Sequence, residues 1–277
     1  MTGLRPIQTL ALFAPTRQAL KELLGALSPR DWELPTACAS WCVKDVAAHL
    51  LAGDLGILSR RRDSYSIPGV PAPRDYNELV ALINALNDAW VMAARRLSPR
   101  VLVDLLAWAG PQVEDYFGTW EPDAPGYPVD WAGPGPAPNW LDLAREYTER
   151  WHHQQQIRDA VGRPGLKEAR YLHPVLDAFV RALPHSFRDV AAPAGTTVLV
   201  RITREGGGDW FVVREATGWG LYLDVQTPPA AAVHVADDDA WRLFTKGLRG
   251  EEALRRVKVE GDPALCRRVL STIAILG

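Results

Sequence analysis

The stretch Glu149-Arg150-Trp151-His152-His153-Gln154 places acidic and imidazole side chains inside a segment with helical periodicity. Asn139 can cap this helix, and Gly162 with Pro164 can end it. The apolar positions that repeat at helical spacing are Trp140, Leu143, Tyr147, Trp151 and Ile157. Residues 149 and 153 are four apart, so a turn of about 100° per residue puts them on one face, about 40° apart. This carboxylate and this imidazole can therefore bind one metal ion, with His152, three residues from Glu149, as the alternative partner.

A second segment supplies a third candidate ligand. From Val43 to Asp63 the apolar residues follow a period near 3.6, as an amphipathic helix requires, and His49 borders their stripe. Two ligands from one helix and one from a neighbouring helix leave a coordination position open for a substrate. In the competing interpretation, His49 is a histidine at the edge of the core, bonded to the backbone, and Glu149 is a solvated charge.

Two short runs resemble a known family. Trp41-Cys42-Val43-Lys44-Asp45-Val46-Ala47-Ala48-His49-Leu50 is similar to the second-helix signature of the mycothiol-dependent maleylpyruvate isomerase family, a branch of the DinB-like metal-binding bundles. Glu149-Arg150-Trp151-His152-His153-Gln154-Gln155-Gln156-Ile157 resembles that family's last-helix signature. The resemblance implies that His49, Glu149 and His153 are the metal ligands. Gln156 stands where the family often carries Asp, and His152 stands where an apolar residue is usual.

The first 165 residues are predicted to form a DinB-like four-helix bundle. The predicted helices span residues 16–27, 43–63, 75–97 and 98–117, followed by the helix after Asn139, and Gly110-Pro111 is expected to kink or split the fourth. Turn residues fill 66–73. The Pro- and Gly-rich segment 121–139 is either a lid over the site or a passive connector.

Residues 166–277 are predicted to form a small α+β domain, and this part resembles the sterol-carrier-like domain found in many members of the family. Helical periodicity over 171–187 gives way to strands at 196–202, 210–214, 219–223 and 232–235, with helices at 238–245 and 263–275. The triglycine at 206–208 precedes a strand and opens no helix. It is therefore a hairpin turn rather than a phosphate-binding loop.

The composition narrows the class of protein. The 277 residues are 47% hydrophobic, enough for two cores, and 31 Lys and Arg balance 33 Asp and Glu. A nucleic acid or an anionic membrane is therefore a disfavoured partner. No stretch approaches the roughly 20 apolar residues that cross a bilayer. Cys38, Cys42 and Cys266 form no C-x-x-C pair, so we expect a cytoplasmic protein with free thiols.

The ligand set indicates the chemistry. Two imidazoles and a carboxylate suit Zn²⁺ best and also accept Fe²⁺, Ni²⁺ or Mn²⁺. Such a metal lowers the pKa of a bound thiol or of a bound water. The resemblance implies the thiol: mycothiol as cosubstrate, used to isomerise maleylpyruvate-like substrates or transferred to an electrophile.

Substrate groups and rival functions complete the prediction. Asn87, Asn84 and Arg158 lie on predicted helices and are the candidate substrate-binding residues. The resemblance also implies an arginine from the C-terminal domain, for which Arg201, Arg214 and Arg242 are equal candidates. The two alternative functions are a metal-dependent hydrolase that activates water and a small-ligand-binding protein without catalysis.

Overall fold

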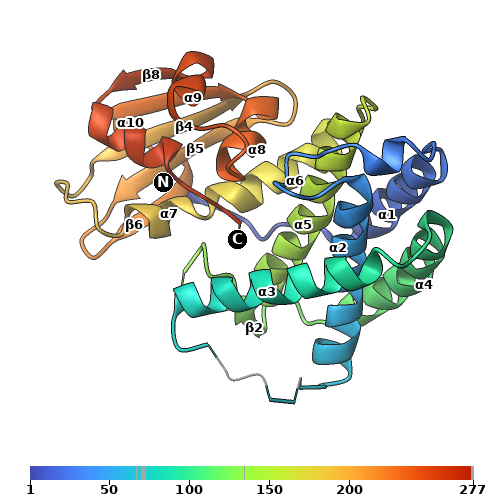
Figure 1. Ribbon diagram of the computed structural model, residues 1–277. Coiled ribbons are helices and arrows are strands. Elements are labelled where there is room, and N and C mark those ends of the chain that lie inside the picture. The colour runs from blue at the N-terminus through green and yellow to red at the C-terminus, as the bar shows by residue number, and fades with distance from the viewer. Residues whose placement is uncertain (67, 70–72, 134, 276–277) are drawn as a thin grey trace. The chain divides into compact units, whose positions relative to one another are not determined.

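The computed structural model describes residues 1–66, 68–69, 73–133 and 135–275, so the predicted turn at 66–73 lies partly outside the described residues. The chain folds into two compact units (Figure 1). The bundle unit comprises Leu10–Glu121 and Glu146–Gly165, and the sheet unit comprises Met1–Thr9, Pro122–Arg145 and Leu166–Leu276. The domain boundary between residues 165 and 166 stays a prediction.

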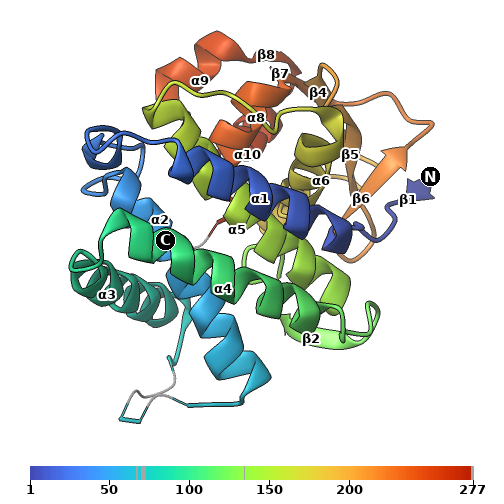
Figure 2. The ribbon, with the colours of Figure 1, turned by 90° about the vertical axis from the view of Figure 1, so that its right-hand side faces the viewer.

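The bundle unit is helical. Its long helices are α1 (Leu10–Gly25), α2 (Val43–Gly56), α3 (Tyr76–Ala94), α4 (Pro99–Phe117) and the larger part of α5 (Asn139–Ala160), with a short 3₁₀ turn η1 (Asp31–Glu33). Figure 2 shows α1 and α4 side by side, and α4 also packs on α2. Tyr147 and Trp151 of α5 are fully buried, which confirms that this helix supplies the centre of the bundle.

Helix α1 begins earlier than predicted. The expected start after Pro15 is wrong, since α1 runs from Leu10 with Pro15 inside it. Phe13 is only 2% exposed and extends the apolar stripe to the other side of the proline. Pro15 has no N–H and therefore removes one hydrogen bond in the N-terminal half of the helix. The packing of Phe13 outweighs that loss.

Helices α2 and α4 also differ from expectation in detail. The predicted helix 43–63 is α up to Gly56 and continues as the π-helix η2 (Ile57–Arg62). Helix α4 is capped by Ser98, whose side chain accepts from Val101 N–H, and it passes through Gly110-Pro111 without a break. Gly110 is needed there because a Cβ would lie 2.2 Å from Cδ of Arg17, which crosses α4 at this point.

The sheet unit contains a six-stranded sheet in the order β1-β6-β5-β4-β7-β8. Its strands are β1 (Thr2–Gly3), β4 (Thr197–Thr203), β5 (Gly208–Arg214), β6 (Trp219–Asp224), β7 (Ala231–Ala236) and β8 (Lys258–Gly261). The pair β4–β7 is parallel and the other pairs are antiparallel. The triglycine forms the predicted β4–β5 turn, where a Cβ on Gly207 would lie 1.9 Å from the Ile202 carbonyl oxygen.

Helices surround this sheet. They are α6 (Ala169–Val180), α7 (Leu183–Phe187), α8 (Asp237–Phe244), α9 (Gly250–Arg256) and α10 (Pro263–Leu270), of which α7, α8 and α10 contact strands directly. The single helix predicted over 171–187 is two helices, and the one predicted to reach residue 275 ends at Leu270. Helices followed by an α+β sheet confirm the predicted fold class.

The segment 121–139 holds a small two-stranded hairpin, β2 (Pro125–Pro128) with β3 (Pro136–Pro138). Val129 and Trp131 between the strands are buried, so the described part of the segment is an ordered structure rather than an open loop. Its role as a lid stays a prediction. Among the described residues, no helix has both the length and the apolar character needed to span a bilayer.

Candidate metal centre

His49 lies on α2 and is held in place by its neighbours along the chain. The ring of Trp41 packs against the His49 imidazole, with ring centroids 5.1 Å apart. One residue earlier, the carbonyl of Ala48 accepts a 2.8 Å hydrogen bond from Nε1 of Trp90 on α3. Helix α2 itself begins at a capping box in which Asp45 accepts from the Cys42 backbone N–H. The position of His49 is thus fixed by a cap, an aromatic contact and a neighbouring helix.

Glu149 and His153 lie on one face of α5, as their spacing predicts. Oε2 of Glu149 is 3.4 Å from Nε2 of His153. His49 approaches the same place from α2, with its ring centroid 4.6 Å from that of His153. One ligand atom from each of the three residues lies within 4.8 Å of the other two. A metal ion at the centre of such a group would be at ordinary bonding distance from all three after small side-chain adjustments.

The two imidazoles have opposite electrostatic surroundings. Burial and, to a smaller extent, the neighbouring charge of His153 lower the pKa of His49 to about 4, although Glu149 opposes them. Burial alone would also lower the pKa of His153, but the Cys38 thiol and the Glu149 carboxylate raise it to about 10. His49 is therefore a neutral imidazole at pH 7, whereas His153 is protonated and would release one proton when a metal binds. A neutral imidazole is the form that binds a metal.

Nδ1 of His49 is buried and has no hydrogen-bond partner among the described residues. Leaving a buried polar atom without a partner costs about 1–3 kcal/mol. Each such atom in a folded protein calls for a reason, and a bound ion is one of the ordinary reasons. The cluster of His49, Glu149 and His153 offers two histidine nitrogens and a carboxylate, the donor set of Zn²⁺, so the residues fit a divalent metal.

A polar network orients the His153 ring. Oε1 of Gln156 is 2.8 Å from Nδ1 of His153 and also accepts from the Cys38 thiol at 3.0 Å. The amide nitrogen of Gln156 lies 3.0 Å from Nε2 of His152. Because Oε1 only accepts, Nδ1 of His153 carries hydrogen and Nε2 is left to face Glu149. Gln156, which stands where the family often carries Asp, thus orients the His153 ring.

Cys38 is the neighbour that the sequence did not reveal. It is 118 residues from Gln156 and belongs to no motif with the three candidate ligands. Cys38, Cys42 and Cys266 are free thiols, as expected. His152 turns to Gln156 instead of joining the cluster with His49, so the four-residue pair is the one that the structure brings together.

The candidate substrate residues are placed differently from one another. Asn87 is partly buried and lies three residues before Trp90 on the face of α3 that meets α2, whereas Asn84 is exposed. Arg158 donates to the carbonyls of Ala19 and Arg163. The bond to Ala19 ties the end of α5 to α1. The substrate roles of the three residues stay predictions.

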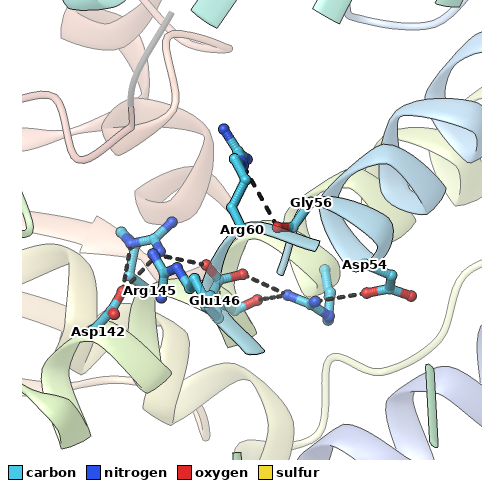
Figure 3. Close-up of polar contacts among 8 residues, drawn as sticks. Asp54, Gly56, Arg60, Asp142, Arg145 and Glu146 are labelled. Atoms are coloured by element: carbon cyan, nitrogen blue, oxygen red, sulfur yellow. Dashed lines mark hydrogen bonds and ion pairs between the residues drawn. The ribbon is translucent and has the colours of Figure 1, made fainter. Parts of the chain in front are cut away.

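A second group of buried charges lies on another face of α5. Arg150 donates to Oδ1 of Asp54 at 2.6 Å and to Oε2 of Glu146 at 2.8 Å. Figure 3 shows the two carboxylates on either side of one guanidinium. Burial raises the pKa of Asp54, and Arg150 opposes that rise. No sequence motif predicts this triad, because Asp54, Glu146 and Arg150 look like ordinary charged residues of amphipathic helices.

Comparisons with known proteins agree with this architecture. The family model described as the mycothiol maleylpyruvate isomerase N-terminal domain matches residues 13–158. A crystal structure of the mycothiol-dependent maleylpyruvate isomerase and that of a histidine-to-alanine mutant of it superpose with a TM-score of 0.56 each, at 11% and 10% sequence identity. Each comparison covers 94% of this chain and 96% of the other. At these identities the likeness concerns the fold.

The remaining comparisons add little. The crystal structure of sterol carrier protein 2 like 2 from Aedes aegypti covers 35% of this chain and 95% of its own, at 16% identity and a TM-score of 0.28. That similarity is too low to support an inference about the sheet unit. No curated protein sequence matches the chain at a significant level. The family model alone spans more than half of the 277 residues, and the chain belongs to the mycothiol maleylpyruvate isomerase family.

Proposed function

We propose that the protein is a metal-dependent enzyme that activates a low-molecular-weight thiol of the mycothiol type, with His49, Glu149 and His153 as metal ligands and zinc as the metal. The observation that carries the proposal is the gathering of two imidazoles and a carboxylate, with one ligand atom from each residue within 4.8 Å of the other two. Membership of the family supports the thiol as cosubstrate. A cytoplasmic location, where such thiols are kept reduced, is part of the proposal.

The residues around the cluster divide the work. A bound divalent metal would supply Lewis acidity that lowers the pKa of a thiol. Gln156 holds the His153 ring with Nε2 toward the cluster, and the Trp41 ring shields His49 on one side. The Glu149 side chain is 31% exposed, so a small molecule can reach the cluster from that side. Asn87, Asn84 and Arg158 are the candidate contacts for a substrate.

The proposed reaction requires no net change in the thiol. The thiolate sulfur adds to one carbon of a cis double bond conjugated to a carbonyl, and the carbon–carbon bond then rotates as a single bond. Elimination of the same thiolate returns the trans isomer of a maleylpyruvate-like substrate. With an electrophile that cannot eliminate the thiol, the same addition ends as S-transfer.

Metal analysis is the first experiment. We expect the purified full-length protein to bind one divalent metal per chain, and the variants His49→Ala, Glu149→Gln and His153→Ala to lose most of it. His185→Ala is the matched control, because His185 is a partly exposed histidine of the sheet unit. Full metal occupancy in all three cluster variants would contradict the ligand assignment.

A thiol assay is the second experiment. Loaded protein is mixed with maleylpyruvate or a model electrophile, with and without mycothiol. We expect turnover only when thiol and metal are both present, and loss of turnover in the His49→Ala and His153→Ala variants but not in His185→Ala. Equal turnover without any thiol would contradict the proposal, and thiol-independent turnover of an ester or amide would favour the hydrolase. An absence of turnover with full metal occupancy would point to binding alone.

A further inference from the structure

A cavity lies inside the bundle unit, between the side chains of α1, α2, α4 and α5. The volume of the cavity is about 40 Å³, which is enough for roughly three water molecules at ~10–15 Å³ each. Most of its wall is apolar, and its apolar residues include Phe13, Leu20, Leu50, Leu106 and Val113. Figure 2 shows the arrangement of these helices. Water is held poorly in an apolar space of this kind, whereas a small apolar molecule is held well.

The cavity is separate from the candidate metal centre. Leu50, Arg150 and Gln154 line it, and each directly follows one of the three candidate ligands in the sequence. One residue along a helix is a turn of about 100°, so the cavity and the metal centre lie on different faces of α2 and α5. Helices α1 and α4 line the cavity and contribute no residue to the metal cluster.

The charged groups in the cavity wall are neutralised by one another. Arg17 makes a two-point ion pair with Glu114, with distances of 2.6 and 3.0 Å. Arg150 is bonded to Asp54 and reaches Glu146 beyond the cavity. Lys21 also lines the cavity, but it is exposed and can stay solvated. A charged ligand inside would lose its hydration and find no uncompensated charge, so the wall selects for an uncharged molecule.

One polar atom in the wall lacks a partner. Oγ1 of Thr16 is buried, on a residue that is 2% exposed, and it makes no hydrogen bond to any described residue. Thr16 is among the residues that line the cavity. A hydroxyl can donate one hydrogen bond and accept others, so it can pair with a ligand that carries a single hydroxyl group.

We propose that this cavity is a second binding site, for a small uncharged molecule with an apolar body and one hydroxyl group, such as a phenol or a short branched alcohol. The apolar body occupies the space between Leu20, Leu50 and Leu106, and the hydroxyl pairs with Oγ1 of Thr16. The site is independent of the proposed metal and thiol chemistry, and its ligand class follows from the cavity wall alone.

A ligand panel tests the proposal on the unmodified full-length protein. Phenol, toluene, benzoate and benzylammonium each carry one benzene ring, and at pH 7 the last two are an anion and a cation. Binding is followed by titration in two-dimensional amide NMR and by soaking crystals. We expect phenol to bind most tightly, toluene about three- to tenfold more weakly because it lacks one hydrogen bond, and the two ions not at all. The shifted amides should belong to α1, α2, α4 and α5.

Variants locate the site. Thr16→Val removes the hydroxyl with little change in volume, and it should lower phenol affinity about three- to tenfold while leaving toluene affinity unchanged. Thr9→Val is the matched control, because Oγ1 of Thr9 is also buried without a partner among the described residues but does not line the cavity. Leu106→Trp should fill the cavity and abolish binding of both molecules, with folding checked by circular dichroism.

Several outcomes would overturn the proposal. They are no binding of phenol up to its solubility limit, equal binding of benzoate and phenol, electron density for water alone in the soaked crystals, or phenol located outside the cavity. An unchanged phenol affinity in Thr16→Val would show that the Thr16 hydroxyl does not bind the hydroxyl of phenol. None of these readouts uses metal content or turnover, so failure here leaves the proposed enzymatic function untouched, and the reverse also holds.

Discussion

Two faces of helix α5 both bury charged or titratable groups, yet they differ in how those groups are satisfied. On one face Glu149 and His153 meet His49, whose Nδ1 has no partner among the described residues. On the other face Arg150 is bonded to Asp54 and Glu146, and Arg61 supplies a second positive charge beside Glu146. The first face includes a polar atom without a partner, whereas Arg150, Asp54 and Glu146 on the second face are all paired. Buried charge alone therefore does not mark a functional site, but an unsatisfied donor or acceptor within it does.

The largest expected effect breaks the complete face. Arg150→Ala leaves the buried carboxylate of Asp54 without its counter-charge and leaves Glu146 with Arg61 alone, which should lower the free energy of unfolding by about 3–5 kcal/mol. Urea-induced unfolding measures this change. The control Arg100→Ala removes an ion pair with an arginine side chain that is 92% exposed, and should cost less than about 0.5 kcal/mol.

A compensated variant sharpens the same prediction. Combining Arg150→Met with Asp54→Leu removes one buried ion pair as a whole, and Glu146 keeps Arg61 as its partner. It should recover most of the stability that Arg150→Ala loses, because no unpaired charge then stays buried. Metal content per folded chain should be unchanged in both. If Arg150→Ala were as stable as the wild type, or if it lost metal while remaining folded, the two faces would not be independent.

The next effect concerns the open face. Gln156→Leu removes the acceptor that fixes Nδ1 of His153, and metal affinity or thiol-dependent turnover should fall about 10–100-fold. The matched control is Gln154→Leu, two residues away on the cavity side, where the amide donates to the Thr16 carbonyl. Competition with a metal-binding dye compares the affinities. Equal losses in the two variants would show that Gln156 acts only through general stability.

The smallest effect tests the support of α2. Trp90→Phe keeps the aromatic packing and removes the 2.8 Å hydrogen bond to the Ala48 carbonyl, beside His49. We expect a loss of about 1 kcal/mol in the free energy of unfolding. Metal affinity should fall slightly at most, since the capping box and the Trp41 contact still hold the helix. A loss of metal without a loss of stability would mean that Trp90 positions His49 directly.

The sequence predicted what depends on short spacing. Glu149 and His153 share a face because they are four residues apart on one helix, and the strands near 196–235 are marked by β-branched and aromatic runs between turn residues. The family and the fold class followed from the same short signatures and are confirmed. The metal ligands and the substrate residues stay predictions, although the structure gathers His49 with the pair on α5.

Long-range pairing lay beyond the sequence. Arg17 meets Glu114 across 97 residues and Arg150 meets Asp54 across 96, and no periodicity within a helix reports such a contact. The edge strands β1 and β8 are short, so their pairing partners, not their own residues, decide their structure. The predicted start of α1 was wrong for a related reason, because the burial of Phe13 outweighs the local preference of Pro15 to begin a helix.

Helix α5 belongs to both units, and this affects any attempt to produce one unit without the other. Residues Asn139–Arg145 of this helix group with the sheet unit, where Ala144 packs with Ile7 and Ala178, and Trp140 covers that cluster. A polypeptide ending at Gly165 would keep Ile7, Trp140 and Ala144 and lack Ala178, so an apolar patch would face water. Such a fragment should be prone to self-association, whereas removing the first turns of α5 would deprive the sheet unit of its own core residues.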